Sequence, residues 1–227
     1  MSPTFQMACC SRMRSYIDQR FIAGVSRFPS KFRVRRVFRG LVMAIARPLA
    51  RAGVRADTVS YLSLFFAYLA FISLLVFQSP ILFGCSVFIA GLLDGVDGAV
   101  ARETSSGSSR GAFTDSVLDK AAEIIILFAI LLVFSGSVVL GLSVESWVFL
   151  AVSGWLMTSY TRARAESLGA RDLDIGLGGR SERLLILVVF SLLGLILWGI
   201  VVVSLVSLGT AVYRAIHYSG QIRDSLQ

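Results

Sequence analysis

Four aspartates flanked by apolar residues are the part of this sequence best suited to chemistry: Asp94, Asp97, Asp115 and Asp119. A charge inside hydrocarbon is costly, so acids in apolar segments are usually paired, solvated or functional. Carboxylates that converge in a low dielectric repel one another and need either protons or cations. Oxygen ligands favour a hard divalent ion such as Mg²⁺ or Mn²⁺, so the pattern indicates a metal site.

Helical spacing predicts that these aspartates form two pairs. Asp94 and Asp97 are three positions apart, and Asp115 and Asp119 are four apart, so each pair shares one helix face. The loop over residues 102–110 joins the two helices and allows the two faces to meet.

The residues beside the aspartates favour a phosphate-bearing substrate. Arg102 would place a fixed cation near the carboxylates. Gly98 and Gly111 remove side chains where a substrate or a facing helix approaches the backbone. Two other interpretations stay open at this point. One is a proton or cation pathway in a transporter, and the other is a structural network of the carboxylates with Arg102 and Lys120.

The composition indicates that the helices carrying these aspartates belong to a polytopic membrane protein. Of the 227 residues 56% are apolar, and the mean hydropathy is +0.76. The last apolar block, 184–213, would be about 45 Å long as one helix, whereas a hydrocarbon core is about 30 Å thick. We therefore divide this block near Gly194–Gly199. The expected fold is all-α, with six transmembrane helices that begin near residues 58, 80, 111, 144, 184 and 199.

Basic residues are concentrated before the first span. Residues 1–55 hold twelve of the cations behind the net charge of +8, against a single acid, Asp18. Apolar residues interleave with them over 32–45, which predicts an amphipathic helix on anionic headgroups rather than a nucleic-acid-binding arm. We divide the chain into a basic N-terminal segment (1–56), a six-helix domain (57–220) and a short tail (221–227).

The six-span model places the basic residues on or near one side of the membrane. The turns on the opposite side, near residues 78–80, 135–145 and 194–199, carry no Lys or Arg. The positive-inside rule then predicts a multi-pass protein of the cell membrane, with both termini and the aspartates on the cytoplasmic side.

The string from Asp94 to Asp119 resembles, position for position, the motif of the CDP-alcohol phosphotransferase family, D-x2-D-G-x2-A-R-x8-G-x3-D-x3-D. The resemblance extends over roughly residues 45–220, because a surface helix followed by six spans is also the plan of that family. Ala56 and Asp57 stand where the family usually has Pro-Asn, and Ser60 stands where it has Thr.

The resemblance implies an enzyme with two Mg²⁺ or Mn²⁺ ions per active site. It transfers a phosphatidyl-type group from a CDP-linked lipid to an alcohol and releases CMP. Asp94, Asp97, Asp115 and Asp119 would be metal ligands, and Asp119 would also be the catalytic base. Asp94, Asp97, Gly98, Ala101 and Arg102 would contact the nucleotide. A homodimer is also implied, with membrane lipids as partners and no nucleic acid.

The segment 159–183 indicates which alcohol is used. Arg162 and Arg164 precede a loop, and Arg180 and Arg183 follow it. The positive-inside bias and helix ends explain part of this charge, and a pocket for a phosphorylated acceptor explains both pairs. Arg214, near the end of the last span, would be a further phosphate contact or an interface anchor.

The same segment resembles the inositol-phosphate-using branch of the family, although Gly179 replaces a Glu. The implied acceptor is L-myo-inositol 1-phosphate, and the product is phosphatidylinositol phosphate or its archaetidyl (ether-lipid) counterpart. Alternatives are glycerol 3-phosphate, serine or an inositol-based osmolyte pathway, and a cation transporter. Glu123, one turn beyond Asp119, faces the same side, and we expect it not to be a metal ligand. We assign His217 no role.

Overall fold

Residues 37–104, 108–170, 175–176 and 178–224 are described by the computed structural model. They form seven helices and one short hairpin, in the order α3 (Arg39–Arg51), α4 (Ala56–Leu75), α5 (Pro80–Glu103), α6 (Ser109–Val133), β1 (Val138–Val139), β2 (Leu142–Ser143), α7 (Val144–Ser167), α8 (Arg180–Leu192) and α9 (Ile196–Asp224). The fold is therefore helical, as predicted. The first 36 residues of the predicted basic segment lie outside the described residues.

Local signals in the sequence set the helix ends. Ser79, Ser108 and Ser143 precede α5, α6 and α7, and each side chain accepts a hydrogen bond from a backbone N–H three residues on. The long apolar block breaks at Gly194, whose φ of +71° is left-handed backbone that glycine adopts at little cost. The break over residues 193–195 lies at the edge of the predicted interval, and it limits α8 to 13 residues.

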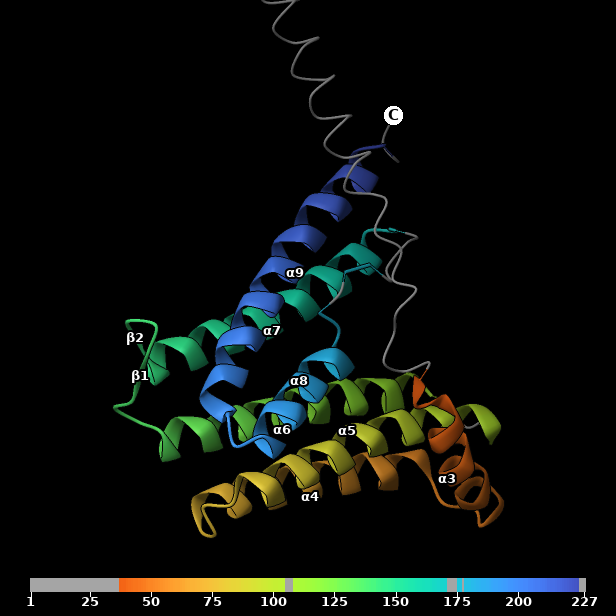
Figure 1. The fold of residues 1–227 in the computed structure, drawn as a ribbon. Helices are drawn as coiled ribbons and strands as arrows, with labels where there is room; N and C mark the ends of the chain where they lie inside the picture. Colours follow the sequence, from red (N-terminus) through yellow and green to blue (C-terminus); the bar gives the residue numbers. More distant parts are fainter. Residues whose placement is uncertain (1–36, 105–107, 171–174, 177, 225–227) are drawn as a thin grey trace, which may run out of the picture.

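The helices form two groups, as Figure 1 shows. α4, α5 and α6 lie side by side, α8 packs on α5, and α7 crosses α9 above them. α3 runs across the end of α5. Its apolar residues Val42 and Ala46 belong to a cluster with Leu93, Val96 and Val100 of α5. This packing places α3 next to the aspartates of α5.

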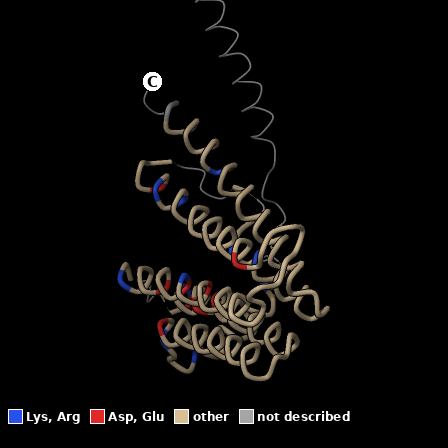
Figure 2. The backbone as a smooth tube through the Cα atoms, turned by 90° about the vertical axis from the view of Figure 1, so that its left-hand side faces the viewer, with Lys and Arg blue, Asp and Glu red and all other residues tan. Residues whose placement is uncertain are grey.

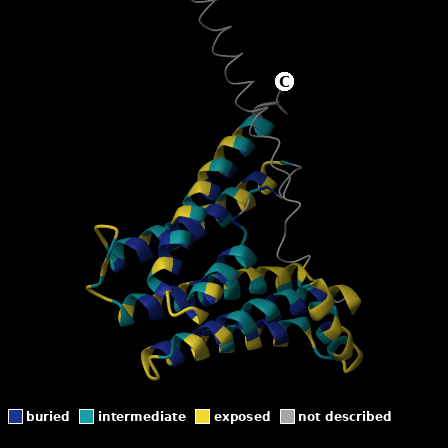
Figure 3. Ribbon diagram, viewed as in Figure 1, coloured by how far each residue is buried: buried dark blue, intermediate teal, exposed yellow. Residues whose placement is uncertain are grey.

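The outer surface of the helices fits hydrocarbon. Helices α4, α5 and α9 are each long and apolar enough to cross a membrane. Figure 3 shows many exposed residues along α4. They are largely apolar: Tyr61, Leu62, Phe65, Tyr68, Leu69, Ile72 and Leu75. Contiguous apolar surface of this kind suits lipid better than water. The chain is a membrane protein, while the number of six spans and their sidedness stay predictions.

Most of the described charges gather toward one end of the helices (Figure 2), where α5 and α7 end and α6 and α8 begin. The opposite end carries the hairpin, which the sequence analysis did not predict. Its antiparallel register pairs Val138 with Ser143. The carboxylate of Glu145 accepts hydrogen bonds from Ser135 Oγ at 2.7 Å and from Gly136 N at 2.8 Å. These bonds close the turn before the hairpin.

Candidate active site

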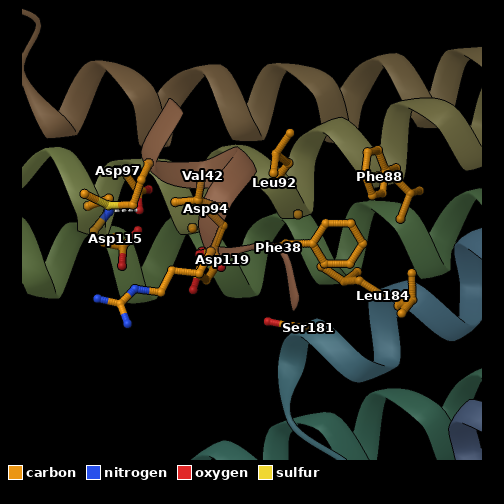
Figure 4. Close-up of a pocket in the computed structure, with 18 of the residues that line it drawn as sticks. Phe38, Val42, Phe88, Leu92, Asp94, Asp97, Asp115, Asp119, Ser181 and Leu184 are labelled. Atoms are coloured by element: carbon orange, nitrogen blue, oxygen red, sulfur yellow. Dashed lines mark hydrogen bonds between the residues drawn. The ribbon is translucent and has the colours of Figure 1, made fainter. Parts of the chain in front are cut away.

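The two predicted aspartate faces meet between α5 and α6. Asp94, Asp97 and Asp115 each offer a carboxylate oxygen, and these oxygens all lie within 4.8 Å of one another. Asp94 and Asp97 are buried, whereas Asp115 is partly exposed. Figure 4 shows these three side chains and Asp119 gathered along the two neighbouring helices. The spacing of the motif therefore predicted the cluster correctly.

Helix α4 also contributes to the cluster. Ser60 Oγ donates a hydrogen bond to Asp97 Oδ2 at 2.7 Å and lies 3.4 Å from Asp115 Oδ1. The other oxygen of Asp97 accepts from the backbone N–H of Gly98. Carboxylates held by hydrogen bonds in this way keep a fixed orientation, which a metal centre requires.

The donor set fits a divalent cation. Three carboxylates within reach of one another cannot all be charged in a largely buried site unless positive charge lies between them. Only oxygens are offered by this group of three, which favours a hard ion such as Mg²⁺ or Mn²⁺. Asp119, the fourth predicted ligand, lies outside this group of three and pairs with an arginine.

That arginine is Arg180, the first residue of α8. Its Nη1 lies 2.7 Å from Asp119 Oδ1 and also contacts Asp94 Oδ1, and its Nε lies 3.4 Å from Glu123 Oε1. The structure thus brings Arg180 onto the carboxylate cluster itself, where its positive charge offsets part of the repulsion among the carboxylates.

Arg183, one turn further along α8, is only 1% exposed. Its Nη2 lies 3.6 Å from Glu123 Oε1, and its guanidinium stacks 4.8 Å from the ring centroid of Trp155. Its Nε and Nη1 find no hydrogen-bond partner among the described residues. Buried guanidinium donors without partners are costly, so they indicate a place where an anionic group can bind.

The remaining predicted arginines lie elsewhere. Arg162 and Arg164 are exposed near the end of α7 and do not belong to the described lining of the pocket. Arg214 is buried and donates hydrogen bonds from Nε to Ile175 O at 3.0 Å and from Nη1 to Thr158 O at 2.9 Å. Of the five arginines, the structure therefore places Arg180 on the aspartates and Arg183 on the neighbouring Glu123, although neither belongs to the described lining of the pocket.

A cavity of about 720 Å³ opens beside the aspartates. Its polar end is formed by Asp94, Asp97, Asp115 and Asp119 with Gly98, Arg102 and Glu103. Apart from Arg39 and Ser181, the side chains that line the rest are largely apolar, and Figure 4 labels five of them: Phe38, Val42, Phe88, Leu92 and Leu184. Ala101 is partly exposed and does not belong to this lining. The cavity suits a ligand with a polar head and an apolar tail.

Two features of the site go beyond the sequence analysis. Glu123 was predicted to face the site, but its ion pairs with Arg180 and Arg183 were not predicted, and Trp155 was given no role at the site. The spacing from Asp119 to Glu123 was an available signal, because residues four apart share a helix face. Their partners Arg180 and Arg183 lie on a helix distant in sequence, and local spacing does not reveal such contacts.

A carboxylate cluster at one end of an apolar cavity, in a membrane protein, defines an enzyme site for phosphate-bearing lipids. Residues 53–216 match the family model described as CDP-alcohol phosphatidyltransferase, and the chain belongs to that family. It is therefore a transferase of phospholipid metabolism, as the aspartate motif indicated.

The chain resembles several inositol-lipid synthases. It is 33% identical over 170 residues to archaetidylinositol phosphate synthase of Pyrococcus horikoshii. The aligned residues make up 75% of this chain and 86% of that relative. It is 34% identical over 159 residues to phosphatidylinositol phosphate synthase of Cutibacterium acnes, and this alignment covers 66% of this chain and 72% of that relative.

The fold matches a solved structure of the same class. The crystal structure of Mycobacterium tuberculosis phosphatidylinositol phosphate synthase in complex with manganese and citrate gives a TM-score of 0.66 at 25% sequence identity, with 78% of this chain and 88% of that chain covered. The manganese of that structure and the aspartate triad of this chain agree on a divalent-metal centre.

Proposed function

We propose that this chain transfers a phosphatidyl-type group from a CDP-linked lipid, CDP-diacylglycerol or CDP-archaeol, to L-myo-inositol 1-phosphate. One observation carries the choice of acceptor. Arg180 and Arg183 lie beside the carboxylate cluster, and Arg183 has buried donors without a partner among the described residues. In this proposal these arginines bind a second phosphate, distinct from those of the nucleotide, through charge-assisted hydrogen bonds. The names of the relatives from Pyrococcus and Cutibacterium support the same acceptor.

In this proposal Asp94, Asp97, Asp115 and Asp119 hold two divalent ions, Mg²⁺ or Mn²⁺. When bound, such ions neutralise phosphate charge and align the attacking and leaving oxygens. Arg102, which lines the cavity, contacts the nucleotide phosphates.

Gly98, which lines the polar end of the cavity, leaves room for the cytidine, and the same role is proposed for Ala101 at the edge of the site. The apolar lining from α3, α5 and α8 takes the lipid chains, so the donor need not leave the membrane.

Asp119 takes the proton of the acceptor hydroxyl. The hydroxyl oxygen then forms a bond to the lipid-side phosphorus, the bond between that phosphorus and the CMP oxygen breaks, and CMP leaves. Arg180 and Arg183 hold the acceptor phosphate, and the predicted contacts from Arg162, Arg164 and Arg214 would add only long-range positive charge. Arg180 would exchange its contacts with Asp94 and Asp119 for the acceptor phosphate as the carboxylates take up metal.

We also propose the predicted membrane arrangement: six spans after a basic surface helix, both termini and the site on the cytoplasmic side, and a homodimer. The exposed arginines of α3 (Arg39, Arg47 and Arg51) support contact with anionic headgroups. The clustering of charge at the end that holds the aspartates supports the sidedness.

The purified protein, supplied with CDP-diacylglycerol, Mg²⁺ and radiolabelled inositol 1-phosphate, should move the label into lipid and release CMP in equal amount. A parallel reaction with glycerol 3-phosphate should yield little labelled lipid. Transfer to glycerol 3-phosphate without transfer to inositol phosphate would reject the proposed acceptor. Cation flux in proteoliposomes without any CMP release would reject the reaction itself.

A further inference from the structure

Glu123 is a buried carboxylate that none of the predicted roles uses. It lies on α6, one turn beyond Asp119, and is 2% exposed. Its Oε2 lies 2.5 Å from Lys120 Nζ, and its Oε1 lies 3.4 Å from Arg180 Nε and 3.6 Å from Arg183 Nη2. A buried carboxylate requires compensating charge. Here three cations converge on it, two of them from another helix.

The contact with Glu123 fixes how Arg180 is turned. A guanidinium is planar and presents its donors in a rigid fork. Arg180 directs Nε toward Glu123 and Nη1 toward Asp94 and Asp119. The contact with Glu123 is an ion pair without a hydrogen bond, so Glu123 acts on the Nε edge of Arg180 through charge while Asp94 and Asp119 contact Nη1.

Arg183 is fixed by the same carboxylate. Glu123 contacts the guanidinium of Arg183 at Nη2, and the ring of Trp155 stacks on the flat face of the same guanidinium. The remaining donors, Nε and Nη1, are buried and have no hydrogen-bond partner among the described residues. Glu123 and Trp155 together leave this edge available to an anion.

The first turn of α8 has few other restraints. Its N-cap residue is Gly179, which provides no side-chain hydrogen bond. The helix packs on α5 and α9. Asp94 and Asp119 also hold Arg180, and Trp155 also holds Arg183, but among these Glu123 is the side chain that contacts both arginines.

A metal-ligand role fits Glu123 less well. It lies outside the group of three carboxylates whose oxygens approach within 4.8 Å of one another. Both of its oxygens already face cations of the protein. A ligand would need at least one oxygen directed at the metal.

We propose that Glu123 is a positioning residue that orients Arg180 and Arg183 toward the phosphate of the acceptor alcohol. The inference rests on the proposed function, because it takes the acceptor to be phosphorylated. Without the carboxylate, Arg180 is drawn fully onto Asp94 and Asp119, and Arg183 loses its only ion-pair partner among the described residues.

The test separates acceptor binding from donor binding in three variants. Glu123→Gln removes the charge at nearly constant size, Glu123→Asp keeps the charge, and Glu145→Gln removes a carboxylate that caps a turn at the far end of the helices. KM for inositol 1-phosphate, KM for CDP-diacylglycerol and kcat are measured at saturating Mg²⁺, and thermal unfolding in detergent reports on folding.

For E123Q we expect the acceptor KM to rise roughly tenfold, because charge-assisted contacts to the arginines are lost, while the donor KM stays within about twofold. E123D should recover most of the acceptor KM. E145Q should lower the unfolding temperature and leave both KM values unchanged. Equal rises in the two KM values for E123Q, or an unchanged acceptor KM, would overturn the positioning role.

Two further outcomes keep the test decisive. Where E123Q does not fold, E123D is used instead. Because its carboxylate is one methylene shorter, its acceptor KM should rise about twofold, well short of the roughly tenfold rise expected for E123Q, while its donor KM stays unchanged; an acceptor KM that does not rise would then overturn the positioning role. Where the wild type uses glycerol 3-phosphate in place of inositol phosphate, the proposed acceptor is wrong. The E123Q comparison is then made with glycerol 3-phosphate, so that its acceptor KM still decides the role of Glu123.

Discussion

Asp119 lies outside the group of three aspartates whose oxygens approach one another within 4.8 Å. Its Oδ1 lies 2.7 Å from Arg180 Nη1, which also contacts Asp94. In the proposed mechanism Asp119 takes the proton of the acceptor hydroxyl. Asp119→Asn should therefore lower CMP release by about 10²- to 10⁴-fold.

A coupled assay of CMP release checks this, with Glu166→Gln, at the exposed end of α7, as the control. Full CMP release by D119N would show that another group takes the proton.

Ser60 supports the cluster from α4. Its hydroxyl donates to Asp97 at 2.7 Å, and groups that orient a metal ligand typically account for 10- to 100-fold in affinity or activity. Ser60→Ala should weaken Mn²⁺ binding by about tenfold, as measured by titration of the free ion's paramagnetic resonance signal.

Ser63→Ala is the matched control, because Ser63 is buried on the same helix but donates to the backbone oxygen of Ala90. If the two variants bound Mn²⁺ equally, the hydrogen bond to Asp97 would have no part in metal binding.

For single residues, the sequence predicted correctly those contacts that follow from regular helical spacing. Asp94, Asp97 and Asp115 meet because their separations match a helix turn and a short loop joins the two helices. The pairing of Arg180 with Asp119 was not predicted, because it depends on how α8 packs against α5. The arginines were expected to bind a phosphate, and their contacts with Glu123 and Trp155 were not foreseen.

Close contact between α7 and α9 depends on one glycine. A Cβ at Gly154 would meet the side chain of Ser207 and lie 3.0 Å from the backbone nitrogen of Leu208. Small residues of this kind let membrane helices approach closely. Gly154→Ala should destabilise the protein by about 1–3 kcal/mol through overpacking.

Thermal unfolding in detergent measures the effect of G154A. The control is Gly209→Ala on α9, where an added Cβ has no atom within 4 Å. Equal unfolding temperatures for the two variants would show that the α7–α9 contact accommodates a methyl group.

The helices were predicted with unequal success for physical reasons. Serine caps, Pro80 and runs of apolar residues are local signals, and the predicted starts of α5 and α7 lie at the observed residues. The hairpin over residues 138–143 was missed because two-residue strands carry no periodicity. The break at Gly194 was predicted because a single helix would exceed the membrane thickness.

For the whole molecule, metal binding should couple activity to stability. The carboxylate cluster holds negative charge that only the folded chain brings together, so a bound divalent ion favours the folded state. Treatment with a chelator should abolish CMP release and lower the unfolding temperature, and Mg²⁺ or Mn²⁺ should restore both. At 100 times its dissociation constant an ion adds about 2.7 kcal/mol to the free energy of unfolding.

Calorimetric titration measures how many ions bind, and two per chain are expected. The Asp97→Asn variant serves as the control, because a metal effect at this site must shrink with the loss of that carboxylate. If chelation left both activity and unfolding temperature unchanged, the cluster would not be a metal centre.

The two-sided cavity has a consequence for how the reaction rate depends on concentration. In the proposed function its polar end takes the acceptor from water, while the apolar lining takes the lipid donor from the bilayer. For the second ligand the relevant quantity is its mole fraction among the surrounding lipids rather than its molarity in the sample. Diluting the donor with inert lipid therefore slows turnover at constant total amount, so that the composition of the membrane itself sets the rate of synthesis.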